Sequence, residues 1–243
     1  MDNEFTAMKM FADVDSSKSK VAKPIAVFSA SMEEAKGGDM KLLITEYCAS
    51  YDEQIANQFI EGLVDDRTAR AIGIAFADLN CNATAPAPDF NLHSTISFKG
   101  VFDNVIKFIE STMQDRSIKT HFKKMLLSGD YEGAKLVRSA EDMYGQRDCI
   151  CHNDSHVFNI LCEAKPEVAM LQNFGPEGGV KIVDWEMSHM GPFGRDIGQL
   201  WSFPLANALN HYRLQQTNDS DHIMKWIRVS WSSYAEQVEV RTC

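Results

Sequence analysis

The sequence lacks an excess of basic residues. Its 243 residues include 24 Lys and Arg against 34 Asp and Glu, which gives a formal net charge of −10. A chain this acidic has no electrostatic field that would draw it to nucleic acid or to an anionic membrane, so we expect neither as a partner. A phosphate-bearing ligand would need a metal ion or a few well-placed cations to overcome local repulsion.

Long apolar runs are also absent. The longest nearly apolar stretch, residues 71–77, falls far short of the roughly 20 residues that span a bilayer. The first five residues are acidic and lack the apolar core of a secretory signal. We therefore expect a cytoplasmic protein whose cysteines are reduced thiols.

Matched pairs of cysteines are missing as well. Cys149 and Cys151 are separated by one residue, with His152 beside them and Cys162 further on. A structural zinc site normally takes cysteines spaced C-x2-4-C together with a second matched pair. The interpretation that we favour is that Cys149 and Cys151 alternate along a short strand.

What is present is the composition of an ordinary folded protein. Apolar residues make up 44% of the chain and charged residues 24%, which is close to the average for soluble globular proteins and enough to fill a core. The length fits one large domain or two small lobes.

The first fifty residues predict a helix, a strand, a turn and a second strand. Apolar side chains recur at helical spacing over residues 4–14. Strand-like runs follow at residues 24–28 and 41–48, and the Lys-Gly-Gly at residues 36–38 between them is typical of a hairpin turn.

The rest of the chain is mainly helical in pattern. Asp65 and Asp66 can cap a helix that ends before a Pro- and Asn-rich loop at residues 80–91. Residues 197–209 predict a buried helix kinked at Pro204. Further apolar stripes, which we expect to be core, occur at residues 101–113, 130–144 and 223–238.

One polar stretch differs from these helices. Asp154 and Asn159 lie at the two ends of a polar loop, and an apolar strand at residues 180–183 leads into Asp184 and Glu186. The short apolar runs around the loop predict a β-hairpin set inside a helical lobe. Because side chains alternate along an extended segment, Asp184 and Glu186 would share one face.

These residue types suit phosphoryl transfer. Asn159, Asp184 and Glu186 supply the hard oxygen ligands that Mg²⁺ prefers, and Asp154 is free to accept a proton from a hydroxyl group. A base, a metal site and a nucleotide phosphate are the recurring parts of phosphoryl transfer. We therefore expect ATP and Mg²⁺ as cofactors and a small hydroxyl compound as substrate.

The same motifs carry a family resemblance. The loop from His152 to Asn159 resembles the catalytic loop of the protein-kinase-like fold, in the form used by small-molecule kinases. Asp184-Trp185-Glu186 resembles the D-x-E of the aminoglycoside phosphotransferase superfamily, which includes choline/ethanolamine kinases and methylthioribose kinases. The His-Asn-Asp spelling is that of choline kinases, whereas the segment from Gly191 to Gly198 resembles methylthioribose kinases.

The resemblance implies an α+β, protein-kinase-like, two-lobed fold. Residues 1–50 would form a truncated N-terminal lobe with the hinge, and residues 51–243 a mainly helical C-terminal lobe. Asp154 would be the catalytic base that orients the substrate hydroxyl. Asn159 and Asp184 would hold Mg²⁺, and Glu186 would help with the metal or its water.

The resemblance also implies a nucleotide site and its supports. Backbone groups of the hinge would hold adenine, at Glu46, Tyr47 and Cys48. Three residues would support the site: His152 packed beneath the catalytic loop, Asp196 bracing that loop from a helix start, and Glu4, the helix acid that normally pairs with a phosphate-binding lysine.

The sequence departs from the family pattern before that helix. The family places a glycine-rich hairpin and a strand lysine there, but only Met1, Asp2 and Asn3 precede Glu4. We expect the lysines that follow to be solvated surface groups and not substitutes, namely Lys9, Lys18, Lys20 and Lys23.

Two other hypotheses therefore stand beside the small-molecule kinase. One is a kinase-like binding protein without catalysis, and the other is an incomplete gene product. Among kinase substrates, the sequence leaves open a methylthioribose-like sugar, choline or ethanolamine, and an aminoglycoside. It predicts no oligomeric state.

Overall fold

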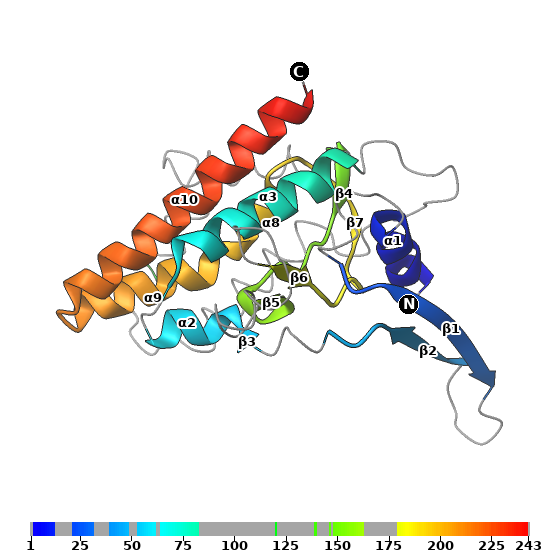
Figure 1. Ribbon diagram of the computed structural model, residues 1–243. Coiled ribbons are helices and arrows are strands. Elements are labelled where there is room, and N and C mark those ends of the chain that lie inside the picture. The colour runs from blue at the N-terminus through cyan, green and yellow to red at the C-terminus, as the bar shows by residue number, and fades with distance from the viewer. Residues whose placement is uncertain are drawn as a thin grey trace, which may run out of the picture.

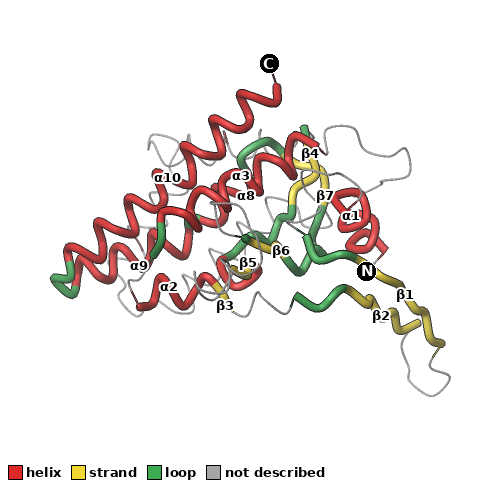
Figure 2. Tube along the Cα trace, viewed as in Figure 1, coloured by secondary structure: helices red, strands yellow, loops and turns green. Residues whose placement is uncertain are grey.

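The computed structural model describes residues 2–12, 21–31, 39–48, 53–61, 64–82, 120, 139, 146, 148–162 and 179–242. The described elements form two parts, a β-hairpin that projects beside one helix and a larger, mainly helical body (Figure 1; Figure 2). None of the described helices is both long and apolar enough to cross a membrane.

The smaller part consists of α1 (Asp2–Ala12), β1 (Pro24–Ser31) and β2 (Asp39–Thr45). The predicted helix, strand and strand are confirmed, although β1 is longer than expected and β2 ends at Thr45. The two strands are antiparallel, and Phe28 lies opposite Leu42. Both of these side chains are more than half exposed, and the predicted turn at residues 36–38 lies outside the described residues.

The helical body is built around two long helices. Their neighbours are short, and the full set is α2 (Ile55–Glu61), α3 (Asp66–Asn82), α8 (Arg195–Leu200), α9 (Ser202–Arg213) and α10 (Thr217–Thr242). Helices α3 and α10 lie along one another, and α9 flanks α10 (Figure 1). The predicted cap is confirmed, because the Asp65 carboxylate accepts a hydrogen bond from the Arg67 amide at 3.0 Å.

Short strands lie between these helices. They are β3 (Glu53–Gln54), β4 (Cys149–Cys151), β5 (Ile160–Cys162), β6 (Val180–Ile182) and β7 (His189–Gly191), with a 3₁₀ turn, η1, at Val157–Asn159. The sequence predicted a single hairpin in this region, whereas the structure has two small sheets. Antiparallel β5 and β6 join β3 in one sheet, and β4 pairs with β7 in another.

The predicted end of the helix that Asp65 caps is wrong. Helix α3 continues to Asn82 through Asn80, which is fully buried and donates a hydrogen bond to the Ile150 carbonyl at 3.3 Å. The buried partner stabilises a residue that local propensity assigns to a loop. The remaining loop residues, the predicted helix at 101–113 and all of 130–144 except Ser139 lie outside the described residues.

The predicted kinked helix at 197–209 is two helices. The break falls at Trp201, between α8 and α9. Pro204 lies in the first turn of α9, where its missing N–H removes no helical hydrogen bond and no kink is required. The helix is not buried throughout, because Leu209 is 62% exposed. In α10, Trp231 is likewise partly exposed, whereas Trp226 is fully buried.

Gly73 allows the close approach of α3 and α10, and its replacement gives a clear prediction. A Cβ at this position would lie 2.3 Å from the Ser230 carbonyl oxygen and 2.9 Å from the Tyr234 amide nitrogen. Because both neighbours are helix backbone, the helices must separate, and we expect Gly73→Ala to lower the free energy of unfolding by about 3 kcal/mol. Urea denaturation followed by circular dichroism measures the change.

Gly198 provides the matched control. It lies in α8, and a Cβ built there meets no atom within 4 Å. Gly198→Ala should be neutral or stabilise the protein by up to about 1 kcal/mol, because alanine loses less backbone entropy in a helix. Equal effects of the two substitutions would contradict the packing argument.

Candidate functional site

His152 supports the polar loop from below. It is fully buried, and its Nε2 lies 2.8 Å from the Val183 carbonyl oxygen while its Nδ1 lies 3.2 Å from the Asp154 amide nitrogen. A carbonyl only accepts and an amide N–H only donates, so the ring is a neutral imidazole protonated at Nε2. Burial lowers the pKa of His152, and the ring packs edge-on against Trp185 at 4.6 Å.

Asp196 fixes the start of the loop. Its two carboxylate oxygens accept hydrogen bonds from the amides of His152 and Asn153, at 2.9 and 3.0 Å. The Ser155 hydroxyl donates to the Asp196 carbonyl at 2.8 Å. Asp196 is 2% exposed and lies in the first turn of α8, where the helix dipole favours a negative charge. One side chain therefore holds two consecutive main-chain groups of the loop.

Asn153 turns the chain toward Asp154. Its φ of 65° is in the left-handed region, which asparagine tolerates better than most residues. Its side-chain amide donates to the carbonyls of Cys151 and His189, at 3.0 and 3.2 Å. Sequence reasoning gave Asn153 no role, although its tolerance of positive φ was a usable signal.

The structure brings Asp154 and Asn159 together. The Asn159 amide donates to the main-chain carbonyl of Asp154 at 3.0 Å and to its carboxylate at 3.3 Å. The Asp154 side chain is 33% exposed, so a solute can reach it. His156, which sequence reasoning missed, lies with Nε2 3.5 Å from the same carboxylate. The result is an accessible acid on a tightly held backbone.

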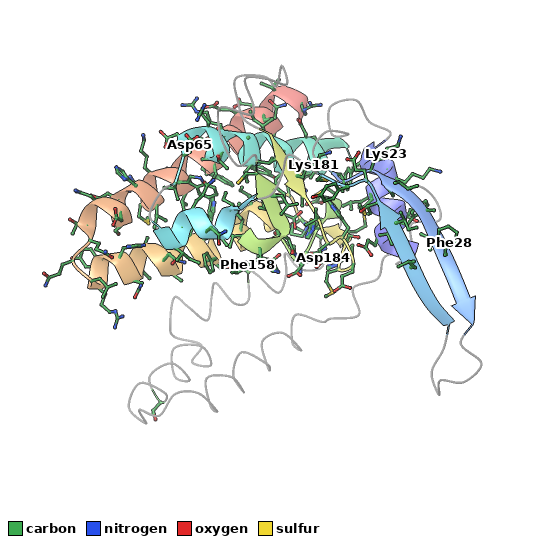
Figure 3. All side chains as sticks on the ribbon, turned by 60° about the horizontal axis from the view of Figure 1, so that its bottom comes forward. Lys23, Phe28, Asp65, Phe158, Lys181 and Asp184 are labelled. Carbon is green, nitrogen blue, oxygen red and sulfur yellow. The ribbon has the colours of Figure 1, made fainter. Side chains whose placement is uncertain are left out.

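Asp184 and Glu186 do not lie on a strand, so the alternation argument for their shared face is wrong. Strand β6 ends at Ile182, and Asp184 has a φ of 67°. Between the two acids Trp185 is buried, donating from Nε1 to the Ile182 carbonyl at 3.0 Å and packing against Phe11 at 4.9 Å. Both acids are exposed. Buried Trp185 and the positive φ of Asp184 thus expose the carboxylates of Asp184 and Glu186 to solvent. Figure 3 labels Asp184 at this turn.

The donor chemistry at this turn fits a hard cation. Mg²⁺ binds through one or two carboxylates and keeps several waters, and Asp184 and Glu186 supply two exposed carboxylates. Among the residues that the structure describes, no three His, Cys, Asp or Glu side chains gather closely enough to hold a metal ion.

Glu4 lies beside these acids. It is half-buried in α1, and its carboxylate accepts a hydrogen bond from the main chain of Trp185. Burial raises the pKa of Glu4, and the negative charges of Asp184 and Glu186 add to the rise. Of the lysines expected at the surface, Lys9 and Lys23 are exposed, whereas Lys18 and Lys20 lie outside the described residues.

The predicted hinge residues follow β2. The Glu46 amide donates to the Lys23 carbonyl at 2.8 Å, and the Glu46 carboxylate accepts a hydrogen bond from Lys181 at 2.8 Å. Tyr47 is 91% exposed. Cys48 is half-buried, and burial raises the pKa of its thiol. Sequence reasoning missed Lys181, although a lysine inside an apolar strand was a usable signal.

The segment from Gly191 to Gly198 links β7 to α8. Gly194 has a φ of 78°, and its amide donates to the Tyr234 hydroxyl at 2.7 Å. Arg195 Nη1 lies 3.2 Å from His189 Nε2 and donates to it, because His189 Nδ1 donates to the Met187 carbonyl. The segment therefore ties the Asp196 helix to both β7 and α10.

The strand interpretation of the paired cysteines is confirmed. Cys149 and Cys151 lie on β4, both buried, with their sulfur atoms 3.7 Å apart. The hydrogen bond with Cys149, together with burial, raises the pKa of the Cys151 thiol well above its usual range.

The buried His152 predicts a pH dependence of stability. Its pKa in the folded protein is lowered by burial, so the unfolded chain takes up the proton first as the pH falls. The contribution is complete above the unfolded value of about 6.5 and is lost below it. We therefore expect the urea concentration at the unfolding midpoint to decrease as the pH is lowered from about 7.5 to about 5.5, the range in which histidines titrate.

Two substitutions make that measurement specific. His152→Gln should flatten the pH dependence, whereas His222→Gln, at an exposed position of α10, should leave it intact. His189, whose pKa burial also lowers, supplies a remaining slope of the same sign. An unchanged slope in His152→Gln would show that His152 is not the titrating group.

Comparison with known proteins gives one partial similarity. No protein-family model matches the chain. Part of the chain is nevertheless similar to a kinase. That relative is a methylthioribose kinase of Geobacillus sp. (strain WCH70), 34% identical over 94 residues, which are 39% of this chain and 20% of the kinase. The matched part thus spans about a fifth of the relative's length.

Proposed function

We propose that the chain is a small-molecule kinase, which transfers a phosphoryl group from ATP to a hydroxyl group. The observation that carries the proposal is the state of Asp154, a partly exposed carboxylate on a loop that Asp196 and Asn159 hold in place. The partial similarity to a kinase supports it. We also propose a protein-kinase-like fold for the chain, because the same loop resembles the catalytic loop of that fold.

In this proposal Asp154 accepts the proton of the substrate hydroxyl as that oxygen attacks phosphorus. Asn159, Asp184 and Glu186 are the residues that would hold Mg²⁺, which neutralises phosphate charge when it is bound. The main chain at Glu46, Tyr47 and Cys48 would bind adenine. His152 and Asp196 act on the reaction only by positioning Asp154.

We propose a methylthioribose-like sugar as the first substrate to test. The segment from Gly191 to Gly198 and the partial similarity to a methylthioribose kinase both support this choice. Choline, ethanolamine and aminoglycosides remain alternatives, because the His-Asn-Asp spelling at Asp154 resembles that of choline kinases.

A second candidate is a kinase-like binding protein without catalysis. The observation that favours it is the position of Glu4, whose carboxylate bonds the Trp185 main chain beside Asp184 and Glu186. Glu4 adds a further carboxylate near Asp184 and Glu186, where nucleotide phosphates would lie, and repulsion between like charges disfavours the transition state of phosphoryl transfer.

The deciding experiment combines titration and turnover on the full chain. Isothermal titration with Mg²⁺-ATP is followed by assays for ADP and phosphorylated product with methylthioribose, choline, ethanolamine and an aminoglycoside. Binding with turnover of one substrate supports the kinase. Binding without any turnover supports the binding protein, and no binding of Mg²⁺-ATP would overturn the kinase.

A further inference from the structure

Lys181 is an unusual residue for the centre of a buried strand. It lies between Val180 and Ile182 in β6, and its side chain is only 11% exposed. Removing an ammonium group from water costs several kcal/mol unless partners of good geometry compensate it. A lysine at this place therefore needs specific partners.

Its partners come from the N-terminal part of the chain. The Lys181 ammonium donates to the Glu46 carboxylate at 2.8 Å and to the Val21 carbonyl at 3.2 Å. Val21 also forms a parallel bridge with Ile182. Lys181 thus lies where the β1–β2 hairpin joins the body (Figure 3). Desolvation acts to raise the pKa of Glu46, but the hydrogen bonds from Lys181 and the Lys23 main chain, together with the charges of both lysines, outweigh it and lower the pKa.

The segment after β2 is held from two sides. On one side the Glu46 amide donates to the Lys23 carbonyl at 2.8 Å. On the other side the Glu46 carboxylate meets Lys181. Tyr47 is 91% exposed and adds little packing. The ion pair therefore ties this segment to Lys181 in β6, three residues before Asp184.

We propose that the Lys181–Glu46 ion pair is a positioning element of the nucleotide site. It fixes the main chain of Glu46, Tyr47 and Cys48 relative to the strand that leads to Asp184, and so sets the affinity for the nucleotide. This inference rests on the proposed function. Neither side chain takes part in the chemical step, which distinguishes them from Asp154.

The variants separate local positioning from general stability. Lys181→Met keeps the length of the side chain and removes its charge, Glu46→Gln keeps its shape at a partly exposed position, and Lys181→Arg keeps the charge. The matched control is Lys225→Met, which breaks the exposed Lys225–Asp66 pair between α10 and α3. If Lys181→Met fails to fold, Glu46→Gln carries the test.

The first measurement is amide hydrogen exchange without ligand. We expect exchange over residues 46–48 to accelerate at least about tenfold in Lys181→Met and Glu46→Gln, since a hydrogen bond to a charged group contributes about 1.5 kcal/mol or more. Lys181→Arg should restore part of the protection, and Lys225→Met should leave it unchanged. No acceleration, or equal acceleration throughout the chain, would overturn the proposal.

The second measurement is titration with Mg²⁺-ATP, with kinetics where turnover is found. We expect an about tenfold weaker Kd and a matching rise in KM for ATP, with kcat within about twofold, and no further loss in the double variant. Unchanged affinity in a variant with faster exchange would overturn the proposal. Absence of ATP binding by the unmodified chain would overturn the proposed function and the nucleotide-binding role of the ion pair. Hydrogen exchange by itself decides whether the Lys181–Glu46 ion pair holds residues 46–48 in place.

Discussion

Asp154→Asn should lower the rate of phosphoryl transfer by about 10³-fold, which is the usual contribution of a positioned general base. The amide cannot accept the hydroxyl proton, but it has the size of the carboxylate and can still accept the hydrogen bond that Asn159 donates. ADP and product formation at saturating substrate measure the loss. Binding of Mg²⁺-ATP should survive, since the predicted adenine site lies at Glu46, Tyr47 and Cys48.

The control for this substitution is Asp65→Asn. Asp65 is also partly exposed, but it caps α3 and bonds Arg67 away from the polar loop. Its substitution should leave turnover unchanged. Retention of activity within about tenfold in Asp154→Asn would exclude Asp154 as the base, and simultaneous loss of nucleotide binding would point to collapse of the site.

Asp196→Ala should lower the free energy of unfolding by about 3 kcal/mol. Two buried amides, those of His152 and Asn153, lose their acceptor, and each unsatisfied buried donor costs about 1–3 kcal/mol. Because the same amides begin the loop that carries Asp154, turnover should fall together with stability. Urea denaturation and the turnover assay measure the two effects.

Asp65→Ala is the comparison for Asp196→Ala. Asp65 also accepts a backbone hydrogen bond, but its side chain is 41% exposed, so water replaces the lost partner. We expect a loss of about 1 kcal/mol, as for other helix caps. Equal losses in the two variants would show that the Asp196 carboxylate does not brace the loop.

Local signals predicted much of the fold. Helical spacing gave α1 and α3, and the Asp65 cap follows from its position before an apolar stripe. Strand pairing was not predictable in the same way, because strands of three residues carry too little alternation to fix a partner. Asn80 shows the other limit, since its place in α3 depends on Ile150 and on Tyr234, whose hydroxyl donates to it.

The candidate site was likewise predictable only in part. The residue types of Asp154, Asn159, Asp184 and Glu186 could be read from the sequence, whereas the positive φ of Asp184 could not. Lys181 and Glu46 are 135 positions apart, and no local pattern connects them. The protein-kinase-like fold stays a prediction.

The contact between Phe11 and Trp185 has a consequence for the order of folding. Helix α1 is synthesised well before the aromatic ring of Trp185, on which its Phe11 packs. At about 5–20 residues per second, the 174 positions from Phe11 to Trp185 take roughly 9 to 35 s to synthesise. Until then Phe11, which is buried in the finished fold, lacks this partner, so α1 completes its packing late.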